Sequence, residues 1–374
     1  MFVSTIFLIT TIICCTTTIS TNQHWIKFVH FQNKFNKHYA NVTELEHRFS
    51  IFQKNILHII QHNANTSNSF ILGINQFSDL TQQEFKTTFA SGYISYKQTI
   101  VPTFTPTTFY PSYSSTSTYP STYPSTSSFR KTTTYDNFDS YGCKLFSIQH
   151  TSNAESLPII MDWRELGAVT KVKDQGQCGS CWTFSATGAV EGAWYISTDQ
   201  LIDLSEQELV DCATGAVYGS QGCNGGQMEG AYKFIIKYGQ CSYTDYPYTE
   251  HDEKCKKCEQ IVSISSCYDV TPNDQLALTT AVSKQPVAVA IEADSRYFQS
   301  YTGGILDAES CGTNLDHGVL IVGYGEEQGK KYYIVKNSWG DTWGENGYIR
   351  IARSDKQNDA GICGIAMSAS FPNV

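Results

Sequence analysis

A cysteine at the start of an apolar helix is the strongest candidate for chemistry in this 374-residue chain. The glycine-rich segment 175–180 favours an irregular turn, and Cys181 then opens the apolar run 181–196, which is typical of a helix. The first turn of a helix offers unpaired backbone N–H groups and the positive end of its dipole. Both stabilise a thiolate. We therefore expect the pKa of Cys181 to lie below the ordinary ~8.5 and its sulfur to act as a nucleophile.

A thiolate that cleaves acyl bonds needs a partner base and a site for the oxyanion, and three other residues could supply them. His317 heads an apolar strand-like run and is the best candidate for the base. Asn337 directly follows the strand-like run 332–336, so a hairpin would bring it beside His317, where its amide can orient the imidazole. Gln175 can offer a side-chain N–H to the oxyanion beside the backbone N–H of Cys181.

The segments that must position these residues show two kinds of pattern. Helix-like runs come first, at 181–196, 205–212 and 228–238. Strand-like runs follow, at 287–291, 317–324, 332–336 and 348–352. Helices that precede strands along the chain favour an α+β fold with two separate halves.

The first 92 residues are organised differently. Residues 1–20 are almost wholly apolar or Thr/Ser and too short to span a membrane, which predicts a secretory signal peptide. Beyond them, residues spaced three and four apart share one stripe of a predicted helix: Glu44, Arg48, Phe52, Asn55, Ile59 and Asn63. We expect Glu44 and Arg48 to form an i,i+4 ion pair. Thr81 and Glu84 have the form of a capping box for a second helix.

A change in composition separates this region from the rest of the chain. Between Thr99 and Thr134, Thr, Ser, Pro and Tyr account for 29 of 36 residues. Such a segment has too few apolar side chains to form a core, so we expect an extended linker.

The overall composition excludes some classes of protein. With 26 basic against 35 acidic residues the net charge is −9, which argues against nucleic-acid binding and against docking on anionic membranes. Beyond the first twenty residues, no apolar stretch approaches the ~18–20 residues of a membrane span. We expect a monomer that needs no cofactor and no metal.

The segment from Asp162 to Val374 resembles the papain family of cysteine proteases and is most similar to its cathepsin L branch. The resemblance rests on Cys-Gly-Ser-Cys-Trp at 178–182, Asp-His-Gly at 316–318 and Asn-Ser-Trp-Gly at 337–340. The stripe at 44–63 and the segment 73–79 resemble the two motifs of that family's inhibitory propeptide. The resemblance implies a papain-like two-lobed α+β fold, with a helical lobe, a β-barrel-like lobe and an active-site cleft between them.

We therefore expect four segments along the chain. They are a signal peptide (1–20), a helical inhibitory propeptide (21–92), a Ser/Thr/Pro/Tyr-rich linker with the maturation site near its end (93–156), and a papain-like peptidase domain (157–374).

The resemblance also implies roles for single residues. Cys181 would be the nucleophile and His317 the general acid and base, with Asn337 orienting His317 and Gln175 completing the oxyanion hole. Trp339 would shield the His317–Asn337 hydrogen bond from water. The substrate-binding positions would be Gly225, Gly226, Met228, Ala290, Leu315, Asp316, Trp339 and Ser368. The pocket for the second residue before the scissile bond carries no charge, so it should accept a bulky apolar side chain in protein and peptide substrates.

Ten of the thirteen cysteines follow Leu157. The resemblance implies the pairs Cys178–Cys223, Cys212–Cys255 and Cys311–Cys363. Cys241, Cys258 and Cys267 are left over, so one further disulfide could form among them, and the remaining thiol could pair with Cys143. A zinc site built from His251, Cys255, Cys258 and Cys267 is an alternative use of the same sulfurs.

The expected regulation follows from the propeptide. We expect it to inhibit the enzyme and to weaken at low pH, as carboxylates such as Asp79 become protonated. Asn41 and Asn65 begin glycosylation sequons, and the signal peptide predicts the secretory pathway, ending in the lysosome or outside the cell. Two alternatives stay open: an aminopeptidase whose cleft keeps a disulfide-held propeptide remnant, and a non-catalytic homologue that binds other proteases.

Overall fold

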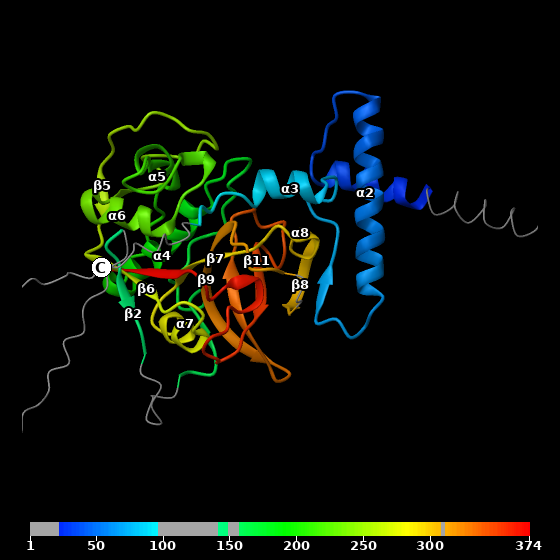
Figure 1. Cartoon of the computed structure of the whole chain (residues 1–374). Helices are drawn as coiled ribbons and strands as arrows, with labels where there is room; N and C mark the ends of the chain where they lie inside the picture. Colours follow the sequence, from blue (N-terminus) through cyan, green and yellow to red (C-terminus); the bar gives the residue numbers. More distant parts are fainter. Residues whose placement is uncertain (1–21, 96–140, 149–156, 308–310) are drawn as a thin grey trace, which may run out of the picture.

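A computed structural model describes residues 22–95, 141–148, 157–307 and 311–374 (Figure 1). The predicted signal peptide and the whole of the Thr/Ser-rich stretch 99–134 lie outside these residues. Within the described part of the chain, no helix combines the length and the apolar character needed to cross a membrane.

The N-terminal portion is helical, as the sequence predicts. Residues 22–34 are helical, and they are followed by α2 (Val42–Asn63), β1 (Phe70–Leu72) and α3 (Gln82–Phe89). The side chain of Asn41 caps the N-terminus of α2. Thr81 and Glu84 form the predicted capping box at the start of α3, where each side chain accepts a hydrogen bond from the other residue's backbone N–H.

The predicted stripe of α2 faces the interior, but the expected ion pair within it is wrong. Phe52, Asn55 and Ile59 are buried. Glu44, however, turns back to accept a hydrogen bond from the backbone N–H of Ala40 at 2.9 Å. Because the open N-terminus of a helix attracts a carboxylate, this contact replaces the pair with Arg48. The Arg48 guanidinium instead reaches α3 and lies 2.9 Å from the Glu84 carboxylate.

The helices of the C-terminal portion come mostly before its strands. They are α4 (Cys181–Thr198), α5 (Glu206–Cys212), α6 (Met228–Tyr238), α7 (Gln275–Val282) and α8 (Arg296–Ser300), with short 3₁₀ helices at Gly222–Asn224 and Ile362–Gly364. The first two turns and more of α4 are buried almost all round, which fits its content of Ala, Gly and Ser. Figure 1 shows α4, α5 and α6 gathered in one lobe, beside a second lobe built around the strands.

A ten-stranded sheet forms the second lobe, in the order β1-β8-β11-β10-β9-β7-β12-β6-β2, with β3 paired to β9. Its remaining strands are β2 (Lys144–Phe146), β3 (Met161–Asp162), β6 (Ser266–Val270), β7 (Val287–Ile291), β8 (Tyr301–Leu306), β9 (His317–Glu327), β10 (Lys330–Lys336), β11 (Tyr348–Ala352) and β12 (Ala369–Asn373). A separate two-stranded sheet pairs β4 (Gln240–Cys241) with β5 (Gln260–Val262). The two-lobed α+β expectation is confirmed.

The β9–β10 hairpin is the element that positions the site. The strands pair antiparallel, with Lys336 opposite Leu320, so the first residues of β9 lie next to the chain that leaves β10. Gln328 and Gly329 form the turn, both with positive φ, which suits a two-residue hairpin loop. The strands are longer than the sequence pattern suggests because this tight turn lets pairing continue to Glu327 and Lys330.

Parts of the expected linker are structured. Residues 93–95 lie against Gly226, and Lys144–Phe146 form β2, a parallel partner of β6. The order of residues 144–146 has two causes: the strand pairs with β6, and a disulfide joins the preceding Cys143 to Cys267.

The three expected disulfides are present: Cys178–Cys223, Cys212–Cys255 and Cys311–Cys363. Of the leftover sulfurs, Cys241 pairs with Cys258 and Cys267 pairs with Cys143. The zinc alternative is therefore wrong, since Cys255, Cys258 and Cys267 are all used in disulfides. Among the described residues, Cys181 is the free cysteine.

Candidate active site

The nucleophile candidate lies where the two lobes meet. Cys181 is the first residue of α4, and the preceding Ser180 makes no side-chain cap, which leaves the first-turn N–H groups of the helix open. The backbone N–H of Gly318, at the start of β9, donates to the Cys181 sulfur over 3.2 Å. A thiol from the helical lobe and the head of a strand from the other lobe are thus in direct contact.

The predicted base and its orienting residue are side by side. His317 Nε2 lies 2.8 Å from the side-chain oxygen of Asn337, and both residues are buried. The Trp339 ring stacks on the imidazole with 4.6 Å between centroids, which excludes water from this hydrogen bond as expected. The other imidazole nitrogen, Nδ1, is buried and has no hydrogen-bond partner. A proton acceptor is therefore left available next to the backbone that holds Cys181.

Gln175 is fully buried and joins the same group of residues. Its Nε2 donates to the carbonyl of Cys178 at 2.9 Å, and its Oε1 accepts from the hydroxyl of Ser338 at 2.6 Å. An amide nitrogen has two hydrogens, so one of them is uncommitted in these contacts. The sequence motif that contains Ser338 does not by itself indicate a role for this residue. Its hydroxyl fixes which end of the Gln175 amide is the donor.

The expectation of a lowered thiol pKa is wrong for this form of the protein. Burial raises the pKa of Cys181 to about 12, although N–H groups of Gly318, Trp182 and Cys181 itself act in the opposite direction. Burial likewise lowers the pKa of His317 to about 4, against the effect of the hydrogen bond that His317 donates to Asn337. Both side chains are completely shielded from solvent. In the precursor the pair is thus a neutral thiol and a neutral imidazole.

The segment that shields them is the end of the propeptide. Gly92 lies so close to the nucleophile that a Cβ there would be 2.7 Å from the Cys181 sulfur and 2.5 Å from the carbonyl oxygen of Gly179. The Gly92 carbonyl accepts from the N–H of Gly226 at 3.0 Å, and the N–H of Ile94 donates to the Gly226 carbonyl at 3.1 Å. The propeptide therefore crosses the cleft as an extended strand on Gly226.

The neighbouring Gly225 and Asp316 also contact this strand. Gly225 has φ of +107°, and a Cβ there would be 3.0 Å from the Gly92 carbonyl oxygen, so both the turn and the close approach require glycine. The N–H of Tyr93 donates to the backbone carbonyl of Asp316 at 3.0 Å. Burial raises the pKa of the Asp316 carboxyl to about 8, against a hydrogen bond from the Ala293 N–H.

A propeptide side chain occupies the pocket that the sequence analysis assigned to substrate. The hydroxyl of Tyr93 lies 2.9 Å from Oγ of Ser368. Its ring belongs to the same buried cluster as Met228 and Ala290, and Leu315 packs against this cluster. The structure thus places Tyr93 in contact with Ser368 and in the same hydrophobic cluster as the other three predicted pocket residues.

The helical part of the propeptide is held on the second lobe. Phe77 and Phe85 make edge-to-face contacts with the Trp339 ring, with centroids 5.5 and 5.1 Å away. The side chain of Asn75 donates to the Gln299 carbonyl at 2.7 Å. Lys86 of α3 forms an ion pair with Asp294. The residue that shields the imidazole is therefore itself covered by the propeptide.

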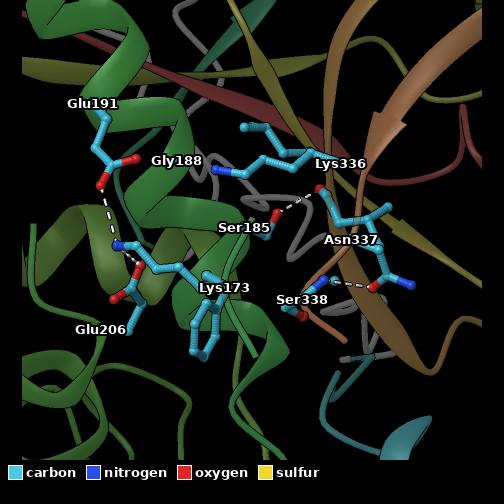
Figure 2. A pocket seen from close by; sticks show the side chains of 12 residues that line it. Lys173, Ser185, Gly188, Glu191, Glu206, Lys336, Asn337 and Ser338 are labelled. Atoms are coloured by element: carbon cyan, nitrogen blue, oxygen red, sulfur yellow. Dashed lines mark hydrogen bonds and ion pairs between the residues drawn. The ribbon is translucent and has the colours of Figure 1, made fainter. Parts of the chain in front are cut away.

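A polar pocket behind the nucleophile escaped the sequence analysis. Figure 2 shows Lys173 between the carboxylates of Glu191 and Glu206, with Lys336 and Asn337 on the opposite wall. Lys173 Nζ lies 2.6 Å from Glu206 and 3.4 Å from Glu191. Burial raises the pKa of Glu206, and burial lowers that of Lys336. These residues are scattered along the chain, so no local pattern could have grouped them.

The two sequon residues are on the surface of the propeptide. Asn41 and Asn65 are exposed. The oxygen of each amide is occupied, because Asn41 accepts from the N–H of Glu44 and Asn65 accepts from the hydroxyl of Ser67.

Comparison with known proteins agrees with this geometry. Residues 157–373 match the family described as papain family cysteine protease, and residues 28–85 match the cathepsin propeptide inhibitor domain. The chain is 43% identical over 337 residues to the KDEL-tailed cysteine endopeptidase CEP2 of Arabidopsis thaliana, covering 89% of this chain and 81% of that protein.

Two solved precursors are also similar over almost their whole length. A recombinant stem bromelain precursor superimposes with a TM-score of 0.76 at 34% identity, covering 94% of this chain and 99% of that one. Digestive procathepsin L 3 of Tenebrio molitor superimposes with a TM-score of 0.73 at 33% identity, with 94% and 99% covered. The chain belongs to the papain family of cysteine proteases and carries that family's inhibitory propeptide.

Proposed function

We propose that Cys181, His317, Asn337 and Gln175 carry the reaction of this cysteine endopeptidase, which is made as a zymogen. The observation that supports the assignment best is the state of His317. Its Nε2 lies 2.8 Å from the side-chain oxygen of Asn337, while Nδ1 is buried and has no hydrogen-bond partner. The next residue, Gly318, donates its backbone N–H to the Cys181 sulfur. A ring fixed at one nitrogen and open at the other suits a base that takes a thiol proton.

The proposed reaction has two halves. In the first, the Cys181 proton moves to His317 Nδ1, and the thiolate attacks the peptide carbonyl carbon. The free N–H of the Gln175 amide and the backbone N–H of Cys181 stabilise the oxyanion. His317 then gives its proton to the departing amine, leaving a thioester on Cys181. In the second half, His317 takes a proton from water, the hydroxide attacks the thioester, and the carboxylic acid product leaves as the proton returns to the thiolate.

Removal of the propeptide activates the pair by restoring solvent and space. The burial that holds the thiol and the imidazole neutral comes partly from Gly92, whose backbone covers the sulfur. Once that segment leaves, the open N-terminus of α4 and the nearby imidazole both favour a thiolate–imidazolium pair. Asn337 is a positioning residue in this scheme, because it acts through the ring of His317.

The expected preference for a bulky apolar residue, second before the scissile bond, is supported by the way the propeptide fills the pocket. Met228, Ala290 and Leu315 supply apolar walls and none of them is charged. Ser368 adds a hydroxyl that meets the phenol of Tyr93. We infer that aromatic residues, tyrosine included, bind here together with Leu and Val, and that arginine does not.

The remaining expectations concern the route of the protein through the cell. We propose that the chain enters the secretory pathway, carries N-glycans on Asn41 or Asn65, and is activated by self-cleavage in an acidic compartment such as a lysosome, or after secretion. Both asparagines are exposed, and five disulfides suit an oxidising compartment.

Acidified wild-type precursor and the Cys181→Ser variant, assayed side by side, test the function. We expect the wild type to cleave a peptide internally even when its N-terminus is acetylated, and the variant to be inactive although it folds. Activity confined to peptides with a free N-terminus would support the aminopeptidase alternative instead. A variant as active as the wild type would exclude Cys181 as the nucleophile.

A further inference from the structure

Two short strands from the region before residue 157 lie at opposite ends of the enzyme's sheet. β1 pairs with β8 at one end, and β2 pairs with β6 at the other. Figure 1 shows β1 on the propeptide side of the molecule and β2 on the far side, next to β6. Both precede the maturation site expected near residue 156, but they are attached in different ways.

The attachment of β1 is non-covalent. It pairs antiparallel with β8, and the propeptide around it adds hydrogen bonds such as that from Asn75 to Gln299. Among the described residues 22–95 there is no cysteine. Nothing covalent therefore holds this segment to the enzyme after the connecting chain is cut.

The attachment of β2 is covalent and is supported by contacts of Phe146. The disulfide Cys143–Cys267 joins it to the first part of β6, and both sulfurs are buried. The Phe146 carbonyl accepts hydrogen bonds from the N–H and the hydroxyl of Thr271, at 3.0 and 3.1 Å. The Phe146 ring meets the ring of Phe371, in β12, edge to face at a centroid distance of 5.2 Å.

Losing β2 would expose an edge of the sheet. β6 would become the outermost strand, with an unpaired row of backbone groups next to apolar side chains, which is an aggregation hazard. Cys143 also belongs to the buried cluster that contains Met228 and Ala290, two residues of the proposed substrate pocket. The segment thus contributes a buried residue to this cluster as well as closing the edge of the sheet.

We propose that the mature enzyme keeps residues 141–148 as a permanent strand of its sheet, linked through Cys143–Cys267, while residues 22–95 are released. Release of residues 22–95 requires a cut between 95 and 141, which hydrolyses one peptide bond, consumes one water, and leaves one chain that contains the Cys143–Cys267 link. A further cut between 148 and 157 consumes a second water and leaves two chains joined by the disulfide. The segment that leaves the cleft, Gly92–Ile94, has no such bond. This inference rests on the proposed function in one respect: it assumes that self-cleavage produces the mature form. Which segment stays attached does not depend on that assumption.

Mass spectrometry of the matured protein tests this directly. Acid-matured wild type is alkylated without reduction, digested and mapped, and its intact mass is measured before and after reduction. We expect a Cys143–Cys267 linked peptide, no alkylated Cys267, and no peptide from 22–95. If two chains are present, reduction releases the smaller one. A mature, active enzyme that lacks residues 141–148, or that has an alkylated Cys267, would overturn the proposal.

A second arm separates this proposal from the proposed function. The Cys181→Ser precursor is cleaved with an unrelated added protease until residues 22–95 are gone, and the product is mapped in the same way. If the wild type fails to mature itself, the proposed function fails, but this arm still decides whether 141–148 stays attached. Retention there supports the strand proposal, and loss of the segment refutes it.

Two double variants give matched controls. Cys143→Ser/Cys267→Ser should lose the 141–148 segment on gel filtration after a cut at 149–156, and should then aggregate at concentrations where the wild type does not. Cys241→Ser/Cys258→Ser removes another disulfide of the same domain and should retain the segment. Equal retention by both variants would show that the disulfide is not what holds the strand.

Discussion

The phenol of Tyr93 lies 2.9 Å from the hydroxyl of Ser368, so the precursor places one of its own side chains at the pocket proposed to select substrate. The same three-residue segment lies over the nucleophile and bonds to Gly226. If these residues have their proposed roles, one extended segment covers both the substrate pocket and the nucleophile.

The proposed substrate pocket should favour substrates whose second residue before the scissile bond resembles Tyr93. In peptides that differ only at the second residue before the scissile bond, we expect kcat/KM to be at least ~10-fold higher for Phe, Tyr or Leu than for Arg, because burying a guanidinium among the apolar side chains of the proposed pocket costs desolvation free energy. The Ser368→Ala variant should lower kcat/KM for Tyr but leave that for Phe nearly unchanged. A preference for Arg would contradict the pocket assignment.

Replacing Tyr93 should weaken inhibition in trans. An isolated propeptide with Tyr93→Ala loses a buried aromatic ring, which corresponds to about 3 kcal/mol, or roughly a hundredfold in Ki. Ile71→Ala, on the exposed face of β1, is the matched control and should inhibit nearly as well as the wild type. Equal loss from both changes would show that the cleft segment has no special part in inhibition.

The precursor's thiol should be chemically silent. With a pKa of about 12, roughly one Cys181 side chain in 10⁵ is ionised at pH 7, whereas a mature thiolate is fully reactive. Iodoacetamide should therefore modify Cys181 in the wild-type precursor at least ~100-fold more slowly than in the matured enzyme at the same pH. Similar rates would mean that the propeptide leaves the sulfur accessible.

Glu84 gives the precursor one of its pH-sensitive contacts. Burial alone would raise its pKa, but hydrogen bonds from Thr81 and Arg48 prevail and lower it. A group with a lowered folded-state pKa stabilises the fold above its unfolded pKa of about 4.3, and this stabilisation is lost as pH falls through the folded value. Acid should thus loosen α3 from α2 and speed maturation.

The Glu84→Gln variant tests this contribution. Because the Arg48–Glu84 pair is partly exposed, we expect no more than about 1 kcal/mol, hence up to about fivefold faster maturation at pH 7 and a smaller acceleration between pH 7 and pH 4. Glu46→Gln, at an exposed position of α2, the helix that carries Arg48, should mature like the wild type. An unchanged pH profile in Glu84→Gln would remove this residue from the acid trigger.

Ser338 should act on the rate through Gln175. Ser338→Ala removes the donor that fixes the Gln175 amide, so we expect kcat to fall about 10-fold with little change in KM; Gln175→Ala should cost about 10²–10³ because an oxyanion donor is lost. Adding Ser338→Ala to Gln175→Ala should cost little more. Independent, additive losses would show that Ser338 does not position the amide.

The core of the site was readable from sequence because its signals are local. A cysteine that opens an apolar run marks a helix start, and two strand-like runs joined by a glycine turn mark a hairpin that brings His317 to Asn337. These relations depend only on backbone geometry, which short segments encode. The capping box at Thr81 was predictable for the same reason.

What sequence could not supply depends on distant partners. The Cys143–Cys267 bond spans 124 residues, and cysteine counting leaves several pairings equally possible. Arg48 pairs with Glu84 and not with Glu44, because the carboxylate of Glu44 binds the backbone at the N-terminus of α2. The high pKa of the thiol arises from burial, to which Gly92 contributes, and no property of the helix start reveals that contribution.

The pH dependence of Cys181 alkylation in the matured enzyme, compared with a His317→Ala variant, tests the catalytic assignment most directly. If a thiolate–imidazolium pair forms, the wild-type sulfur should already react rapidly near pH 5, several pH units below an ordinary thiol, and the variant should need a clearly higher pH to react at the same rate. Superimposable profiles in the two proteins would contradict the pairing of Cys181 with His317.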